Sequence, residues 1–587
     1  MTRFPLTIAL ATTLLASAPA ALAQAVQSDT PQFPKVPGAI RLRPPAPARH
    51  APVNADKVVI DELKGIRLVP DAASLQPADR LDPGLASTVP LARAALGRLQ
   101  PWLGKPVTLR RLTAIENRLI GWYRAHGHPF VSVTTPPQDI TGGVIQIIVM
   151  EYHVGQVRVL KARWSHPAAI RSAIHVAPGG TIDAGAVDQD LTWLNRNPFR
   201  TIDVVATPGK VPGTTDLDFV VHDRFAASVY AGYANDGNLA TGIGRYKAGV
   251  LWGNAFGTNQ QLGYQYTAST DLFAGGSVRP GLGRAPAFQA HAATLDIALP
   301  WHADLQLLGL YEQDRPNLGP DFTSIGHSGQ VSARYVMALK PAARLSQQIA
   351  LGFDFKTTDN NLDFGGTAVS RQASDIDQFS FGYSAARQDA SGETRLDATL
   401  VISPGGITPR NTTADFEPGA NRSGVFRADA AYVYDRITIA RDTRLQHGLV
   451  WSLRVSGQVA STNLLPSEQM LLGGMDSLRG YRALVAGGTD GVNLSNDLRA
   501  PALHPLRTAG IDDALQFDAF FDWGHVWQVH RAPTDPAPID LASFGVGARY
   551  TAGRHLDARV ELGVPLERLQ PGATLHAFAG VTVTVRP

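Results

Sequence analysis

The sequence predicts two small α+β domains followed by a transmembrane antiparallel β-barrel of about 16 strands. Three observations lead to this fold class. The chain opens with a secretory signal, no later stretch reaches the roughly 18 consecutive apolar residues of a spanning helix, and alternating strands fill the larger, C-terminal part. A mature protein of this kind that crosses a membrane must cross it as a closed barrel, because the other solution needs apolar helices.

Composition narrows the classes of function. Apolar residues make up 44% of the chain and charged residues 18%, which is below the usual quarter. The formal net charge of +3 gives no field that would favour nucleic acid as a partner. The sequence contains no cysteine, so disulfides, thiolate catalysis and cysteine-ligated zinc are excluded.

The first residues of the chain are predicted to be a targeting segment and a linker. Residues 1–23 resemble a signal peptide: Arg3 supplies the positive start, an apolar segment follows, and Ala21-Leu22-Ala23 offers a small-x-small cleavage site. Residues 24–56 contain seven prolines, a density that excludes a helix interior and favours an extended linker. Disorder without a role is an equally open interpretation of this segment.

Residues 57–152 are predicted to form the first α+β domain. Apolar residues recur at helical spacing in the middle of this segment, Thr108 can cap the helix, and Gly127 stands where a helix end favours positive φ. Turn residues follow at Pro136-Pro137-Gln138-Asp139 and at Gly142-Gly143. The expected elements are a strand over 58–69, a helix over 107–126 and a strand over 144–150.

Residues 153–224 repeat the pattern in shorter form and are predicted to be a second α+β domain. The order of strand, helices, strand and strand is that of the first domain, so the two domains form a tandem repeat. The expected elements are a strand over 154–160, helices over 166–175 and 186–194, and strands over 201–207 and 215–222.

Residues 225–587 are predicted to be the barrel. Leu556, Ala558, Val560 and Leu562, for example, alternate with Asp557, Arg559 and Glu561, as strands do when one face meets lipid and the other meets water. A soluble sandwich would also alternate, but the signal peptide and the long glycine- and aspartate-rich connections favour the barrel. At roughly 20–25 residues per strand and loop, this segment supplies about 16 strands, an even number as such barrels require.

Three motifs carry a resemblance to a known family. The motifs are Pro136-Pro137-Gln138-Asp139 with the strand that ends at Glu151, Leu478-Arg479-Gly480-Tyr481 preceded by Leu472-Gly473-Gly474, and Phe520-x-Asp522-x-Gly524. They resemble, in that order, the signature of the first periplasmic POTRA domain, the tip of a loop that folds back into the barrel, and the strand motif that meets this tip. Together they resemble the outer-membrane translocators of two-partner secretion (TpsB type, haemolysin activation/secretion proteins).

A lumenal ion pair follows from the last two motifs. On strand 517–527, aromatic side chains such as Phe517 and Phe521 share one face, and Asp518, Phe520, Asp522 and Gly524 share the other, which therefore points into the lumen. An arginine brought into a confined lumen needs a carboxylate partner, which it can bind in bidentate geometry. Spacing alone favours a solvent-facing Arg479 in a loop, whereas the family resemblance favours a pair between Arg479 and Asp522.

The resemblance implies a function and a location. We expect a monomeric outer-membrane pore, with POTRA domains in the periplasm, that binds a large TpsA-type exoprotein and secretes it to the cell surface or medium. The alternatives are a protein or lipid assembly insertase of the same superfamily and a passive porin. Two features depart from the family: residues 24–56 suit a barrel-plugging helix poorly, and the chain ends in Pro587 instead of an aromatic residue.

Three common enzyme motifs are absent from the sequence. The sequence shows no glycine-rich phosphate loop, no His-Glu-x-x-His helix and no Gly-x-Ser-x-Gly elbow. His126-Gly127-His128 lies at a predicted helix end, where positive charge suits the dipole, and Gly326-His327-Ser328-Gly329 lies in a predicted loop without an orienting acid. We therefore predict no enzyme, no metal site and no cofactor.

Overall fold

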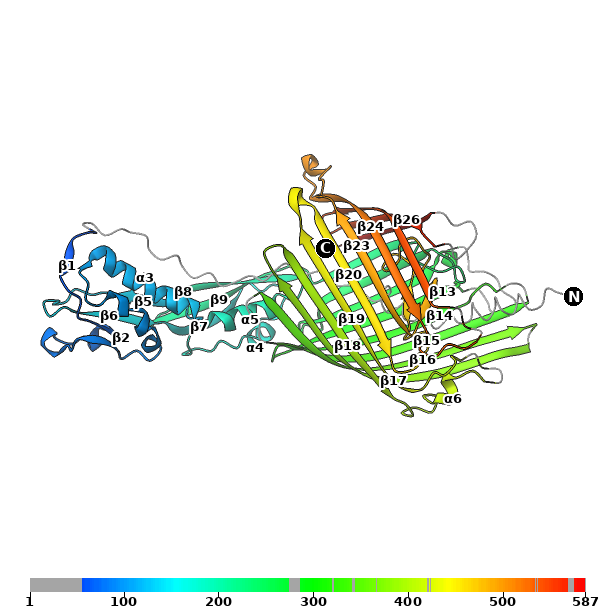
Figure 1. The fold of residues 1–587 in the computed structure, drawn as a ribbon, viewed down its shortest axis with the longest axis horizontal. Coiled ribbons are helices and arrows are strands. Elements are labelled where there is room, and N and C mark those ends of the chain that lie inside the picture. Colours follow the sequence, from blue (N-terminus) through cyan, green and yellow to red (C-terminus); the bar gives the residue numbers. More distant parts are fainter. Residues whose placement is uncertain are drawn as a thin grey trace. The chain divides into compact units, whose positions relative to one another are not determined.

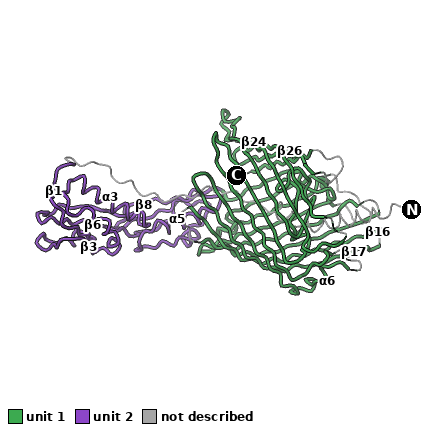
Figure 2. The backbone as a smooth tube through the Cα atoms, in the orientation of Figure 1, with its two compact units in different colours: residues 1–34, 225–587 green, residues 35–224 purple. Residues whose placement is uncertain are grey.

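The computed structural model describes residues 55–585 except 274–284, 319–320, 340–343, 366, 420–421, 423, 534, 536 and 568–574. The chain divides into two compact units, residues 35–224 and the unit that contains residues 225–587 (Figure 2). The predicted signal peptide, residues 1–23, and nearly all of the predicted linker, residues 24–56, lie outside the described residues.

The first half of the smaller unit is a four-stranded sheet with a helix against it. The sheet order is β3-β2-β6-β5, with β2 parallel to β6 and β5 antiparallel to it, and β1 and β4 form a separate pair. The elements are β1 Val58–Ile60, β2 Gly65–Val69, β3 Gly84–Ser87, β4 Val107–Thr108, α3 Leu109–Ala125, β5 Val131–Thr134 and β6 Val144–Glu151, with short 3-10 helices at 72–74, 78–80, 92–98 and 100–102.

One sequence prediction in this half was wrong in detail. The single strand expected over residues 58–69 is two strands, β1 and β2, because the chain turns at residues 61–64. Leu63 is fully buried at this turn, and its backbone amide donates to the carbonyl of Lys105 at 3.0 Å. A buried apolar side chain thus holds the turn, and the polar residues before it stay exposed.

Helix α3 forms where the periodicity predicted it. The hydroxyl of Thr108 accepts a hydrogen bond from the amide of Arg111 at 3.2 Å, as an N-cap does. Ile115, Leu119 and Tyr123 recur at helical spacing and are buried against the sheet. Gly127 follows the helix with a φ of +89°, the left-handed conformation that glycine adopts without strain.

The second half of the smaller unit repeats this topology. Its sheet order is β7-β9-β8, with β7 parallel to β9 and β8 antiparallel to it, the same arrangement as β2, β6 and β5. The repeat that the sequence predicted is therefore present in the strand order and directions. The elements are β7 His153–Leu160, α4 Pro167–Ser172, α5 Ala184–Leu194, β8 Arg200–Pro208 and β9 Thr214–Asp223.

The larger unit is a closed barrel of 16 antiparallel strands, which confirms the predicted strand number (Figure 1). It closes where β10 pairs with β27. The strands are β10 Ala227–Ala234, β11 Arg245–Ala255, β12 Gln260–Ser269, β13 Phe288–Leu299, β14 Ala303–Asp314, β15 Phe322–Ala338, β16 Leu345–Phe364, β17 Thr367–Gln388, β18 Gly392–Pro404, β19 Ala431–Arg444, β20 Val450–Ala460, β23 Asp490–Arg499, β24 Asp513–Trp527, β25 Ile539–Ala552, β26 Leu556–Pro565 and β27 His576–Val585. Short helices lie at 270–272, 413–416 (α6), 446–448 and 507–509.

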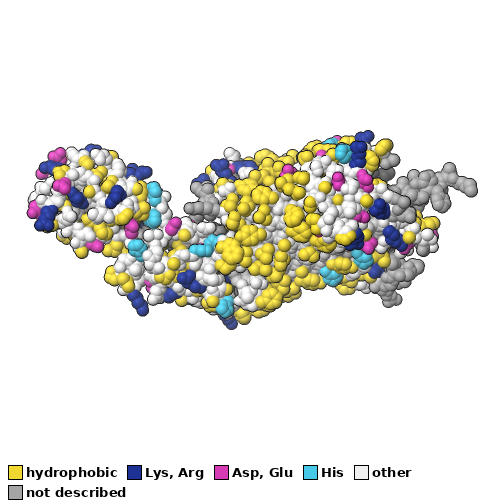
Figure 3. Space-filling model, turned by 90° about the horizontal axis from the view of Figure 1, so that it is seen from below, with side chains coloured by type: hydrophobic (Ala, Val, Ile, Leu, Met, Phe, Trp, Pro, Cys, Tyr) yellow, Lys and Arg dark blue, Asp and Glu magenta, His cyan; other side chains and the backbone are white. Residues whose placement is uncertain are grey.

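The two faces of the barrel wall differ in chemistry. On β24, Phe517 and Phe521 are 47% and 41% exposed on the outer face, whereas Asp522 on the inner face is fully buried. Figure 3 shows apolar side chains gathered over the outside of the barrel. This is the alternation that a wall between lipid and a polar interior requires. Among the described residues, no helix is both long enough and apolar enough to cross a bilayer.

A second sequence prediction was wrong in the barrel. Residues 326–329, expected in a loop, lie inside strand β15. Gly326 leaves room for side chains of both neighbouring strands: a Cβ there would lie 2.5 Å from a carboxylate oxygen of Asp314 and 2.6 Å from the amide oxygen of Asn360. Glycine in a strand thus marks a close approach in this case and not a turn.

Between β20 and β23 the chain folds into the barrel. Residues 461–489, which we call the lumenal hairpin, contain the antiparallel pair β21 Met470–Leu472 and β22 Ala486–Gly488. Side chains of this segment contact inward-facing residues of strands β16, β17, β19, β23 and β24. The hairpin therefore occupies the interior of the barrel.

Candidate functional site inside the barrel

The tip of the lumenal hairpin is a tight turn that depends on glycine. Gly473 and Gly474 have φ values of +101° and +92°, a region that other residues rarely adopt. The amide of Gly474 donates to the carbonyl of Tyr481 at 2.9 Å, and the amide of Tyr481 donates to the carbonyl of Leu478 at 3.1 Å. These bonds present residues 478–481 as a compact tip.

Arg479 at this tip makes a bidentate ion pair with Asp522. Its Nε and Nη2 donate to the two carboxylate oxygens at 2.8 and 2.7 Å, and its backbone amide donates to the same carboxylate at 3.0 Å. Arg479 is 4% exposed and Asp522 is fully buried. Two of the three hydrogen bonds to Asp522 thus come from the guanidinium and one from the backbone of the same residue.

Further acidic groups surround the same guanidinium. Its Nη1 donates to Asp497 at 2.6 Å and lies 3.9 Å from Asp518 and 3.8 Å from Glu561. The guanidinium carbon also lies 3.8 Å from the centre of the Phe520 ring, in cation–π contact. Inward-facing side chains of three strands, β23, β24 and β26, therefore form the pocket for one arginine.

The other residues of the motifs allow the tip to approach the wall. The amide of Gly480 donates to the hydroxyl of Ser543 at 3.2 Å, and a Cβ on Gly480 would lie 2.3 Å from the Cβ of Ser543. A Cβ on Gly524 would lie 2.8 to 3.0 Å from Leu472 and Leu478. Glycine at both positions is required by this contact between hairpin and wall.

Tyr481 and Leu478 hold the tip by different means. Leu478 is fully buried in a small apolar cluster with Leu472, Val526 and Leu541. The hydroxyl of Tyr481 donates to backbone carbonyls of Ala542 and Glu567 at 3.0 and 2.9 Å. The tip is thus fixed to the wall by the ion pairs of Arg479, one apolar cluster and hydrogen bonds, and among the described residues β21 and β22 pair only with each other.

A second contact, which sequence reasoning missed, fixes the base of the hairpin. Glu468 is 1% exposed and accepts hydrogen bonds from Lys356 at 2.6 Å, Tyr434 at 2.9 Å and Gln378 at 3.1 Å. These partners lie on β16, β19 and β17. The backbone carbonyl of Glu468 accepts a further bond from Gln458 at 2.9 Å. We call this set of contacts the base anchor.

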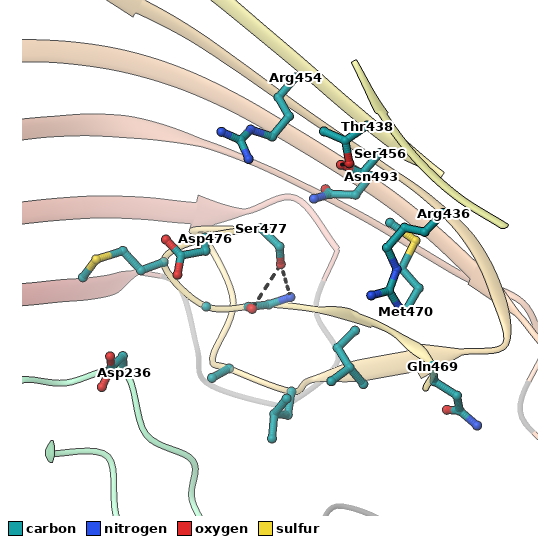
Figure 4. Close-up of a pocket in the computed structure, with 16 residues that line it drawn as sticks. Asp236, Arg436, Thr438, Arg454, Ser456, Gln469, Met470, Asp476, Ser477 and Asn493 are labelled. Carbon is teal, nitrogen blue, oxygen red and sulfur yellow. Dashed lines mark hydrogen bonds between the residues drawn. The ribbon is translucent and has the colours of Figure 1, made fainter. Parts of the chain in front are cut away.

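A cavity of about 300 Å³ separates the hairpin from the wall on another side (Figure 4). Arg454, Thr438 and Ser456 line it from strands β19 and β20, and Asp476 and Ser477 line it from the hairpin. Ser477 bonds to the backbone of Gly473, at 2.8 Å from its amide and 3.1 Å from its carbonyl. Asp236, on the loop after β10, also lines this cavity and pairs with Lys247 at 2.8 Å.

The motif at residues 136–139 lies in the smaller unit and supports the sheet. Gln146 on β6 pairs with β2 on one side, but on the other side strand β5 ends at Thr134 and does not reach it. The side-chain amide of Gln138 takes that place, because it donates to the carbonyl of Gln146 at 2.7 Å and accepts from its amide at 2.8 Å. Asp139 accepts from the amide and hydroxyl of Thr141, and these two bonds lower the pKa of its carboxyl.

The structure thus brings Arg479 to Asp522 and Phe520 and brings Leu478 to Gly524, whereas residues 136–139 belong to the smaller unit. Sequence reasoning missed Asp497 and Glu561 as partners of the hairpin tip, and Glu468 as a residue of the hairpin that contacts the wall. For Glu561 a signal existed, because alternation on strand 556–562 placed it on the polar face. Glu468 lies within the hairpin in a stretch without periodicity, and nothing in the sequence pointed to it.

The chain was compared with known families and proteins. The model of the haemolysin secretion/activation proteins ShlB/FhaC/HecB matches residues 213–550, and the model of the ShlB-type POTRA domain matches residues 85–151. The family match includes barrel strands β10 to β24, nearly all of β25, the lumenal hairpin and the motif at residues 520–524. The resemblance inferred from the motifs is therefore confirmed.

Individual relatives agree over most of the chain. The Heme/hemopexin transporter protein HuxB of Haemophilus influenzae is 21% identical over 82% of this chain and 82% of its own length. The outer membrane transporter CdiB of Dickeya dadantii is 24% identical over 81% of each chain. The solved structure of CdiB from Escherichia coli matches with a TM-score of 0.69 at 18% identity, covering 92% of this chain and 93% of the other, which shows a shared fold.

Proposed function

Because this chain belongs to the family of haemolysin secretion/activation proteins ShlB/FhaC/HecB and is an outer-membrane transporter of the two-partner type, we propose that it secretes one large exoprotein past a movable lumenal hairpin. The observation that carries this proposal is the way the hairpin is held. It lies inside a closed barrel and is bound to the wall by side-chain contacts. Such contacts can open and reform without unfolding the wall.

The gating role is assigned to the tip and its partner strand. Leu478, Arg479, Gly480 and Tyr481 form the part that leaves the wall, and Phe520, Asp522 and Gly524 form the surface that receives it. The exoprotein enters the lumen as an extended chain when these contacts open. The drive comes from outside the protein, because folding of the exoprotein beyond the membrane prevents its return.

The smaller unit is assigned to reception of the exoprotein. We place a first POTRA domain at residues 57–152 and a second at 153–224, after a signal peptide at 1–23 and a linker at 24–56, with the barrel at 225–587. The sheets end in strands β3 and β5 and in β7 and β8, and such edges can pair with an extended client strand. Residues 136–139 stabilise the first of these sheets.

The remaining assignments are simple. The relatives are named as transporters, and we propose no enzymatic activity, no cofactor and no metal for this chain. The barrel acts as a monomer, and its apolar outer face contacts outer-membrane lipid.

The proposal is tested by mass spectrometry of culture supernatant and periplasm from wild-type cells and from cells that lack this protein. We expect one large protein to disappear from the medium, with its fragments in the periplasm, and to return on complementation. An unchanged supernatant with depleted outer-membrane barrels would instead identify an assembly insertase. An unchanged supernatant with normal membranes would leave a passive pore as the remaining alternative function.

A further inference from the structure

A basic groove lies on the first α+β domain, between helix α3 and the segment that precedes it. Its volume is about 600 Å³. Four exposed cations form its rim, the partly buried Trp102 contributes to its floor, and Pro101 also lines it. These residues, which define the basic groove, are Arg98, Lys105, Arg111, Arg118, Pro101 and Trp102.

The fold collects these cations on one side of the domain. Arg111 and Arg118 lie two turns apart on α3 and therefore share a face of the helix. Arg98 ends the short helix at residues 92–98, and Lys105 lies in the connection to β4. No acidic residue lines the groove, and the acidic side chain of α3, Glu116, bonds to the amide and hydroxyl of Thr135.

The cations of the groove lack the carboxylate partners that Arg67 and Arg110 of the same domain have, although Nη1 of Arg111 donates to the backbone carbonyl of Pro106 at 2.5 Å. Arg67 pairs with Asp82 at 3.2 Å and Arg110 pairs with Asp56 at 2.9 Å. In the part of the chain that the structure describes, none of the four groove cations has a carboxylate within ion-pair distance. Positive charges gathered without an acid repel one another, and an external anionic ligand relieves this repulsion.

The shape of the groove indicates the kind of anionic ligand. Trp102 is partly buried and packs against the domain core, so it forms a floor and does not project as a bilayer anchor would. A concave surface with an apolar floor and a cationic rim fits a peptide whose apolar side chains face inward and whose carboxylates reach the rim.

We propose that the basic groove binds an acidic, extended segment of the secreted exoprotein. This inference rests on the proposed secretion function and specifies the chemistry of the segment that is received. The carboxylates of the segment pair with Arg98, Lys105, Arg111 and Arg118, and its apolar side chains contact Trp102.

The test measures binding of a fluorescent peptide of repeating Glu-Val-Ser to the full-length protein in zwitterionic nanodiscs. The groove variant R98Q/K105Q/R111Q/R118Q removes the rim. If each exposed ion pair strengthens binding roughly twofold, loss of the four rim cations should weaken peptide binding by about tenfold or more. Trp102→Ala, which keeps the charge, should also weaken binding, and a Lys-Val-Ser peptide should not bind.

The matched control is K57Q/K64Q/R80Q/R93Q, which removes four exposed cations of the same domain outside the groove. It should change binding by less than about twofold. Amide exchange of α3 verifies that both variants are folded. Equal weakening in the two variants would overturn the proposal, because it would reflect net charge alone. Unchanged peptide binding with loss of binding to phosphatidylglycerol vesicles would also overturn it, in favour of a membrane contact.

Measurement of secretion distinguishes a failure of this inference from a failure of the proposed function on which it rests. If deletion of the chain leaves the supernatant unchanged, the proposed function fails. If deletion abolishes secretion while the groove variant binds peptide and secretes as the wild type does, the inference about the groove fails alone.

Discussion

At the scale of single residues, the hairpin tip depends on one charge. Arg479 is enclosed by four carboxylates from three strands, and Asp522 alone satisfies both arms of the guanidinium and the backbone amide of the same residue. The pair is therefore more than a local stabiliser, because its geometry can form only when the hairpin tip lies against the barrel wall. An arginine that leaves this pocket must have its guanidinium hydrated, and an open lumen supplies the water for this.

Asp522→Ala is expected to release the tip. The change removes the three hydrogen bonds that Asp522 accepts from Arg479 and leaves Asp497, at 2.6 Å, as the nearest carboxylate. The cost in the seated state is therefore below the ~3–5 kcal/mol of a fully uncompensated buried charge. Because the chain has no native cysteine, Asp476→Cys at the exposed part of the tip provides a single reporter for maleimide labelling. Labelling should be faster in the Asp522→Ala background and unchanged by Arg549→Ala, which breaks an exposed pair elsewhere in the barrel. Equal rates in all backgrounds would show that the pair does not hold the tip.

Gly480→Ala is expected to unseat the tip by steric means. The new methyl group would lie 2.3 Å from the Cβ of Ser543, so hairpin and wall must separate. Gly457→Ala is the matched control, since its nearest atom lies 3.8 Å away. The maleimide labelling rate at position 476 should rise for the first variant only. Ser543→Gly should restore slow labelling in the Gly480→Ala background, and a failure of this rescue would argue against the contact.

At the scale of elements, the length of the C-terminal segment was enough to predict the number of strands, and alternation was enough to predict the inward face of β24. It was not enough to predict which strands meet the tip. Asp497 and Glu561 reach Arg479 because the closed barrel sets β23, β24, β25 and β26 side by side with a fixed register. That register is set by strand pairing across the whole sheet, so no local sequence pattern indicates which strands meet the tip. The same reason explains why the loop expected at residues 326–329 is a strand.

The base anchor is expected to hold the hairpin independently of its tip. Glu468→Gln removes the charge that Lys356 pairs with at 2.6 Å and leaves an ammonium in a buried position. Amide exchange over residues 464–470 should become faster, with little change at residues 478–481. In Lys356→Met/Glu468→Leu, apolar groups replace both partners, which is often neutral for a buried pair, and exchange should return toward the wild-type rate. Faster exchange in the double than in the single variant would contradict this account.

Gln138→Leu is expected to loosen the sheet of the first domain at one position. The substitution removes both hydrogen bonds to the backbone of Gln146 and leaves a buried amide and carbonyl unpaired, at about 1–3 kcal/mol. Amide exchange at Gln146 should accelerate, while exchange at Ile148, which pairs with Thr134 of β5, should change less. Gln100→Leu in an exposed position serves as the control. Equal protection at Gln146 in both variants would refute the structural role assigned to the motif.

At the scale of the whole molecule, transport requires the hairpin to move relative to a wall that stays closed. We expect a tether between hairpin and wall to block secretion reversibly. Asp476→Cys and Arg454→Cys line the same cavity from the hairpin and from β20, and a thiol-cleavable crosslinker can join them. Ser456→Cys and Asn493→Cys face each other on the paired strands β20 and β23, so the same reagent there joins wall to wall. Secretion should stop when the crosslinker joins the first cysteine pair and recover after the crosslinker is cleaved. It should continue when the crosslinker joins the second pair. Secretion that continues through the first tether would show that the exoprotein passes without displacement of the hairpin.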